Sequence, residues 1–190
     1  MRPARLQCAR CLRPESTCIC RWVTPTLTDA EVLILQHPLE VHHAKGSARL
    51  LHLSLPGSSL IAGEVFDPLV LQGLLDTDHR VNLLLYPGDA EEAPPALLPT
   101  DPRQIRLVVL DGTWRKSRKM LHLNPALRLL PRLALQAPLP SHYLIRKAHR
   151  PDQLSTLEAT CLALQQLHGP SGRFSPLLAA FDGFVASQMR

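Results

Sequence analysis

The chain has 190 residues, 45% of them hydrophobic, and its 21 Lys and Arg against 16 Asp and Glu give a formal net charge of +5. This composition excludes a disordered tail, and the length predicts one compact domain with at most a small appendage. No uninterrupted apolar run approaches the ~20 residues of a membrane span, and no apolar stretch follows the basic start. We therefore expect a cytoplasmic protein with reduced thiols and no membrane partner. The mild basic excess suits an RNA partner but does not establish one.

Four of the five cysteines lie within the first 20 residues, as Cys8-x-x-Cys11 and Cys18-x-Cys20. Structural zinc takes four thiolate or imidazole ligands in a tetrahedron, and two cysteine pairs joined by a short turn supply that set. Two disulfides or four unlinked thiols are the alternatives, but disulfides are disfavoured in the cytosol. We predict that Cys8, Cys11, Cys18 and Cys20 bind a structural zinc ion in a knuckle over residues 1–24.

Short apolar runs alternate with periodic segments along the rest of the chain. The pattern of buried strands appears over 31–36, 59–62, 81–85, 105–110 and 132–136. Helices are expected over 44–53, from Asp67-Pro68 onward, and over 113–123, 155–167 and 176–186. The proline-rich segment 89–103 is expected to be a loop. Alternating strands and helices predict an α/β domain over residues 25–190, with a mostly parallel sheet flanked by helices.

The segment after the strand 105–110 carries the most chemically informative residues. Asp111 is at the carboxyl end of this strand, where open α/β sheets bind ligands, and Gly112 permits a close approach. The following helix carries Arg115, Arg118 and Lys119 along one face. A carboxylate beside a basic face suits an anionic substrate that must be deprotonated. The alternatives are a plain helix cap by Asp111 or Thr113, a core position for Trp114, and a basic face that is only solvated.

Asp111-Gly112-Thr113-Trp114 contains the namesake Asp-x-Thr-Trp motif of the DTW-domain family, the tRNA-uridine aminocarboxypropyltransferases, which are related to the SPOUT class of RNA methyltransferases. The resemblance runs nearly end to end. It includes the amino-terminal CxxC…CxC, His37-Pro38-Leu39-Glu40, Ala48-Arg49-Leu50-Leu51, Tyr86-Pro87-Gly88, DGTWRKSRKML and Ser155-Thr156-Leu157-Glu158-Ala159. The chain is therefore identified as a member of this family.

The resemblance implies a SPOUT-like fold with a knotted carboxyl-terminal region, S-adenosylmethionine as co-substrate and tRNA as partner. Proteins that resemble this chain transfer the 3-amino-3-carboxypropyl group to uridine N3, usually in the variable loop, and release 5′-methylthioadenosine. An RNA methyltransferase of the same fold and a non-catalytic RNA-binding protein with a zinc knuckle are the alternative functions. A base catalyst counts against the latter. No obligate protein partner is expected.

Specific residues follow from the same resemblance. Asp111 is the candidate base for the N3 proton, with a pKa raised by partial burial. Trp114 is expected to hold the substrate base or to wall the cofactor pocket. Ser155 and Thr156 either present amide groups to the methionine carboxylate or, with Glu158, form a plain capping box. The residues expected at the cofactor are Leu85, Tyr86, Gly88, Leu110, Gly112, Thr113, Trp114, Leu135, Pro138, Tyr143, Ser155, Thr156 and Glu158. Those expected at RNA are Arg115, Arg118, Lys119 and Arg146.

The remaining metal-ligating residue types have simpler interpretations. The histidines at positions 37, 42, 43 and 52 lack the spacing of a metal site, and we expect exposed polar side chains. Cys161 lies among apolar residues of a predicted helix and is expected in the core.

Overall fold

The computed structural model describes residues 6–87, 99–136, 154–169 and 171–188. Five strands form one parallel sheet in the order β2-β1-β4-β3-β5: β1 (Glu31–Gln36), β2 (Ser59–Ala62), β3 (Val81–Leu85), β4 (Ile105–Asp111) and β5 (Arg132–Leu133). The helices are α1 (Ala48–Ser54), α2 (Pro68–Asp76), α3 (Trp114–Leu123), α4 (Pro125–Arg128), α6 (Thr156–His168) and α7 (Ser175–Ser187). The predicted α/β class with a parallel sheet is confirmed.

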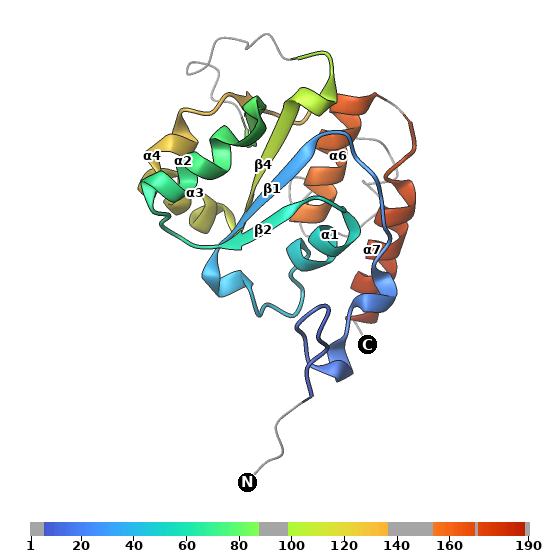
Figure 1. Ribbon diagram of the computed structural model, residues 1–190. Helices are drawn as coiled ribbons and strands as arrows, with labels where there is room; N and C mark the ends of the chain where they lie inside the picture. Colours follow the sequence, from blue (N-terminus) through green and yellow to red (C-terminus); the bar gives the residue numbers. More distant parts are fainter. Residues whose placement is uncertain (1–5, 88–98, 137–153, 170, 189–190) are drawn as a thin grey trace.

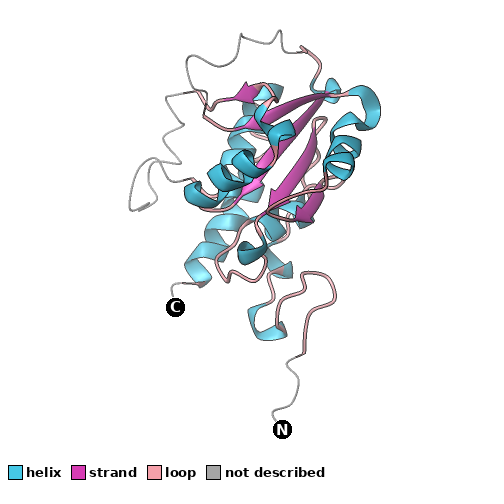
Figure 2. Ribbon diagram, turned by 90° about the vertical axis from the view of Figure 1, so that its left-hand side faces the viewer, coloured by secondary structure: helices cyan, strands magenta, loops and turns pink. Residues whose placement is uncertain are grey.

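Helices cover both faces of the sheet, with α1, α6 and α7 on one face and α2, α3 and α4 on the other (Figure 1). The view turned by 90° shows the strands between these two helical layers (Figure 2). Alternate residues of β4 enter different cores, so that Leu107 and Val109 face the first layer and Val108 and Leu110 the second. A strand buried on both faces requires an uninterrupted apolar run, which is why β4 was readable from sequence.

The order of the strands places a topological switch point between β1 and β4. The connection after β1 passes through α1 to β2 on one side, whereas the connection after β4 passes through α3 and α4 to β5 on the other. Open α/β sheets bind ligands in the crevice outside the carboxyl ends of such a strand pair. The residues at these two ends are Gln36 and Asp111, which pair in register.

Two predicted boundaries were wrong because side chains from elsewhere bind the backbone. The helix expected from residue 44 begins at Ala48, since Arg13 donates to the carbonyls of Ala44 (2.6 Å) and Gly46 (3.0 Å) in the preceding turns. The strand expected over 132–136 ends at Leu133, because the Gln166 side chain hydrogen-bonds the backbone at positions 134 and 136. The short helix α4, which begins at a proline, was not predicted.

The amino-terminal segment packs directly on α7. Ile19 is buried in the first core, and a Cβ at Gly183 of α7 would collide with the ring of Trp22. The guanidinium of Arg13 lies 5.5 Å from the ring centre of Phe184. The segment therefore docks through side chains and has no strand in the sheet. Among the described residues, no helix has both the length and the apolar character needed to span a membrane.

Candidate active site at the carboxyl ends of the strands

The carboxylate of Asp111 lies at the switch point and is only 6% exposed. Its Oδ2 accepts a hydrogen bond from Nε2 of Gln36 at 2.8 Å, and its Oδ1 accepts one from Oγ1 of Thr156 at 2.6 Å. Gln36 ends β1 and Thr156 begins α6. Asp111 thus ties strands β1 and β4 to the start of α6. A carboxylate has four acceptor positions, and the described residues fill two of them.

Burial raises the pKa of Asp111, and the hydrogen bonds from Thr156 and Gln36 offset only part of that rise. The charge of Glu40 adds to the upward shift, while that of His43 opposes it, so both residues lie close enough to act on the site. A carboxylate with a raised pKa accepts a proton more readily, as a general base must.

The helix-cap alternative for Asp111 is wrong. The cap of α3 is Thr113, whose hydroxyl accepts from the amide of Lys116 at 3.4 Å.

An aromatic platform, defined here as Tyr86, Trp114 and Arg132, lies over the ends of β3, β4 and β5. Trp114 is 53% exposed, so the core alternative for this residue is wrong. Its ring meets Tyr86 edge-on with centroids 5.6 Å apart, and the guanidinium of Arg132 lies 5.4 Å from the centre of the Tyr86 ring. Aromatic faces and guanidinium planes are the groups on which proteins stack nucleobases.

The other expected cofactor residues fall in different places. Leu85 and Leu135 are partly buried against the core beneath α6, and Leu110 belongs to the opposite core. A Cβ on Gly112 would come within 3.1 Å of Cβ of Lys116 and 3.6 Å of Cβ of His37, so this position is crowded. Gly88, Pro138, Tyr143 and Arg146 lie outside the described residues.

The amino end of α6 is already provided with hydrogen-bond partners. Ser155 Oγ accepts from the amide of Glu158 at 3.2 Å, and Glu158 Oε2 accepts from the amide of Ser155 at 2.9 Å, which completes a capping box. The amide of Leu157 donates to the buried hydroxyl of Ser47 at 3.2 Å. The capping-box interpretation of Ser155 and Glu158 is therefore confirmed, and three amide groups of this turn are engaged within the protein.

The basic face of α3 is exposed but only partly free. Arg115 and Arg118 are exposed and form no hydrogen bond or ion pair with another described residue. Lys119 donates to Glu64 Oε2 at 2.9 Å, and Glu64 also binds His37 at 2.8 Å. Hydrogen bonds from Lys119, which has the larger effect, and from His37 lower the pKa of Glu64. The structure therefore leaves two arginines on this face available to an anion.

The four amino-terminal cysteines form one cluster, in which all four Sγ atoms lie within 4.8 Å of one another. Cys8 and Cys20 are 3.6 Å apart, Cys11 and Cys18 are 3.8 Å apart, and none is disulfide-bonded. A tetrahedron with Zn–S bonds of about 2.3 Å has sulfur–sulfur edges of about 3.8 Å. The disulfide alternative is wrong, and the donor set fits a tetrahedral metal ion.

The four cysteines of the cluster differ in how readily they ionise. Amide groups of Cys11 and Arg10 donate toward the Cys8 sulfur and lower the pKa of Cys8 to about 6. In contrast, burial raises the pKa of Cys20 to about 12. Four adjacent thiolates repel one another, so ionisation of the whole set requires a cation among them.

Sequence reasoning missed several residues that build this site. Gln36 donates a hydrogen bond to Asp111, and Ser47 accepts one from the first turn of α6. In the sequence each is marked only as a polar residue at the edge of an apolar run. His37 was expected to be exposed and is buried, because Nδ1 accepts from the amide of Leu39 and Nε2 pairs with Glu64. His42 and His43 are exposed as expected, and His52 is half-buried against Ser58. Cys161 is fully buried, which confirms its core assignment.

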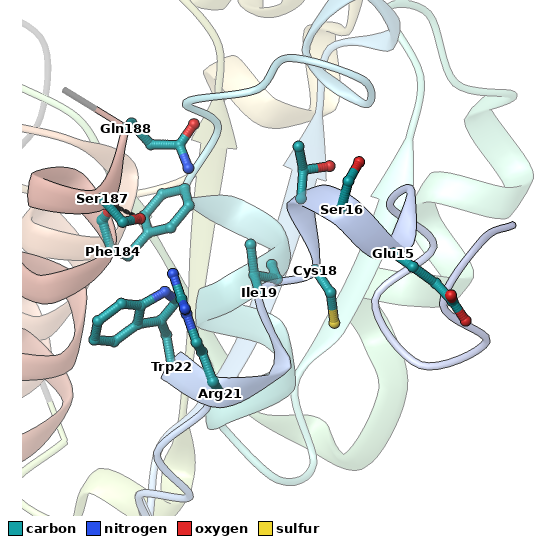
Figure 3. Close-up of a pocket in the computed structure, with 10 residues that line it drawn as sticks. Glu15, Ser16, Cys18, Ile19, Arg21, Trp22, Phe184, Ser187 and Gln188 are labelled. Carbon is teal, nitrogen blue, oxygen red and sulfur yellow. Dashed lines mark hydrogen bonds between the residues drawn. The ribbon is translucent and has the colours of Figure 1, made fainter. Parts of the chain in front are cut away.

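A separate hollow of about 500 Å³ lies between the cysteine-rich segment and the carboxyl end of α7 (Figure 3). Ile19 and Phe184 are buried in its floor, and the guanidinium of Arg21 lies over the Trp22 ring at 4.9 Å. None of its lining residues comes from the strand ends, so this hollow is distinct from the Asp111 site.

Fold and site together define an α/β protein with a buried carboxylate at the switch point and a cluster of four cysteines whose geometry fits a metal ion. The chain belongs to the DTW domain family, whose sequence model matches residues 5–189. It is 34% identical over 170 residues to tRNA-uridine aminocarboxypropyltransferase 2 of Drosophila melanogaster, covering 84% of this chain and 66% of that protein. Proteins with the same name from Mus musculus (28% over 192 residues) and Macaca fascicularis (29% over 197 residues) are each matched over 98% of this chain and 64% of their own length. This chain thus spans just under two thirds of these relatives, and no solved structure matches it.

Proposed function

We propose that this protein transfers the 3-amino-3-carboxypropyl group of S-adenosylmethionine to N3 of a tRNA uridine, in the variable loop, and releases 5′-methylthioadenosine. Membership of the DTW family and the names of the relatives support the reaction and the substrate. The observation that carries it is Asp111, a buried carboxylate with a raised pKa at the switch point beside an exposed aromatic platform. An RNA methyltransferase and a non-catalytic RNA-binding protein are the competing functions.

The chemistry needs a base because neutral uridine N3 is a poor nucleophile. Asp111 accepts the N3 proton on one of its free acceptor positions while Gln36 and Thr156 hold the carboxylate in place. The new bond joins N3 to the carbon that leaves sulfur, and the C–S electron pair stays on sulfur as methylthioadenosine. Trp114 and Tyr86 supply surfaces for the target base or for the adenosine.

The proposal extends to the rest of the molecule. Residues 25–190 form a SPOUT-like catalytic domain with a knotted carboxyl-terminal region, and residues 1–24 form the knuckle. The segment 137–153, which leads from β5 to α6, lies outside the described residues. Unpaired thiols throughout the described chain are consistent with a cytoplasmic enzyme.

The test is incubation of unmodified tRNA with the protein and S-adenosylmethionine, followed by mass spectrometry of the digested nucleosides. The proposed function predicts aminocarboxypropyluridine and an equal amount of methylthioadenosine. Methylated nucleoside would support the methyltransferase instead, and unmodified tRNA that still binds the protein would support a binding protein.

The cysteine cluster is expected to hold about one zinc ion per chain. Cys20→Ser should lose the metal and lower the melting temperature, because three ligands bind zinc less tightly and the Cys11 turn is packed in the core. Cys161→Ala is the matched control and should keep the metal, since this thiol lies apart from the cluster. Elemental analysis checks the prediction, and freshly reduced protein without zinc would contradict it.

The exposed arginines of α3 are expected to contact tRNA phosphates. Replacing Arg115 and Arg118 by Ala should weaken tRNA binding and reduce the slope of log K against log salt by about 1 per lost contact. Lys119→Ala should have a smaller effect, because Glu64 already neutralises that ammonium. Filter binding at several salt concentrations measures both. An unchanged slope in the double variant would mean that this face is only solvated.

A further inference from the structure

An ion pair between Lys116 and Glu40 lies beside Asp111 and has no role in the function proposed so far. Nζ of Lys116 lies 2.7 Å from Oε1 of Glu40, and their side chains are 27% and 14% exposed. Lys116 belongs to the first turn of α3, and Glu40 ends the 3₁₀ turn Pro38–Glu40 that follows β1. The pair therefore joins the two segments that leave the switch point.

Backbone contacts fix this pair close to the Asp111 carboxylate. The amide of His37 donates to the carbonyl of Asp111 at 2.9 Å, and the amide of Glu40 donates to the carbonyl of His37 at 2.8 Å. On the other side, Lys116 approaches Gly112, the residue next to Asp111. The pair lies at the strand ends, within one turn of the candidate base.

The co-substrate of the proposed reaction carries a charge pattern that matches this pair. The aminocarboxypropyl group ends in an α-carboxylate and an α-ammonium on one carbon. Opening the Lys116–Glu40 pair to admit a zwitterion replaces one ammonium–carboxylate contact by two, so neither charge loses its partner. The amino end of α6, the other expected site for the carboxylate, has three of its amide groups engaged.

We propose that Lys116 and Glu40 form the subsite for the α-amino-acid end of the co-substrate, with Lys116 binding the α-carboxylate and Glu40 the α-ammonium. This inference rests on the proposed function and deepens it. An enzyme that transfers this group must hold it near the nucleophile, since any carbon on the sulfonium is activated and position selects which one reacts. The Lys116–Glu40 pair lies within one turn of Asp111 and can bind the amino-acid end of the group at that place.

The test compares two ligands by isothermal titration calorimetry without RNA. S-adenosylhomocysteine keeps the amino-acid end, and 5′-methylthioadenosine lacks it. Lys116→Met and Glu40→Gln should each weaken S-adenosylhomocysteine binding by about tenfold or more, as expected for a lost charge-assisted contact. Both variants should bind methylthioadenosine as wild type does, which also shows that they are folded. Lys116→Arg keeps the charge and should retain most of the affinity.

Lys119→Met is the matched control, because Lys119 forms a similar ion pair with Glu64 one turn further along α3. It should leave the affinity ratio of the two ligands unchanged. Equal losses for both ligands, or no loss for either, in Lys116→Met and Glu40→Gln would overturn the subsite and leave the proposed function standing. Wild-type protein that binds neither ligand would overturn the proposed function and the subsite with it.

Discussion

Asp111→Asn is expected to lower turnover by about 10²- to 10⁴-fold, the usual contribution of a general base, while tRNA and S-adenosylmethionine still bind. The substitution keeps the shape of the side chain. Its oxygen still accepts from Thr156, and the Gln36 amide can rotate to accept from the new nitrogen, so both contacts survive. Raising the pH should partly restore turnover, because uridine N3 then loses its proton without help. Single-turnover kinetics measure the effect.

Thr156→Val separates a base from a residue that only supports the fold. The Thr156 hydroxyl lowers the pKa of Asp111, so its removal should raise that pKa further. A base works only when deprotonated, and the rising limb of the pH–rate profile should therefore move to higher pH in Thr156→Val. In Asp111→Asn the limb set by the Asp111 carboxyl should be lost, and the rate should rise only at the higher pH where uridine N3 ionises by itself. Activity of Asp111→Asn within a few-fold of wild type would remove Asp111 from the mechanism.

Arg106→Met is expected to lower the free energy of unfolding by about 3–5 kcal/mol, as when one partner of a buried ion pair is removed. Arg106 is 1% exposed and lies at the amino end of β4, away from the active site. Its guanidinium donates to both oxygens of Glu31 at 3.0 Å and to the carbonyls of Leu75 and Thr77 at 2.8 Å. The substitution removes all of these hydrogen bonds, although the Leu75 carbonyl still accepts from Nδ2 of Asn82 at 2.7 Å and Glu31 still pairs with Arg80 at 3.4 Å.

Arg103→Met is the control, because Arg103 binds both oxygens of Asp101 but its side chain is 76% exposed. Water replaces such a partner, so Arg103→Met should lower the free energy of unfolding far less than Arg106→Met. Urea denaturation with linear extrapolation compares the two variants. Equal small losses would show that burial of the Arg106 network contributes nothing.

Sequence patterns predicted the centre of the sheet because β1 and β4 are buried on both faces and read as apolar runs. β1 and β4 also carry charges of opposite sign near their starts, Glu31 and Arg106, and these pair in register. The order of the strands was not predictable, since it depends on where each helix packs and no local pattern records this.

The candidate site was predicted only as far as its local motifs reach. The sequence shows that either Asp111 or Thr113 can cap α3. Asp111 instead accepts a hydrogen bond from Thr156, which lies 45 positions away, and the cap is Thr113. Trp114 was ambiguous because an aromatic residue at a helix start is compatible with either core or surface. The ion pair of Lys116 with Glu40 joins residues 76 positions apart, and no local pattern around either residue predicts it.

The most direct test of the central claim uses S-adenosylmethionine labelled either in the methyl group or in the α-carboxyl carbon, with unmodified tRNA as acceptor. Aminocarboxypropyl transfer predicts that carboxyl label enters tRNA in proportion to the methylthioadenosine released, and that methyl label stays with the methylthioadenosine. Methyl label in the tRNA without carboxyl label would contradict the account.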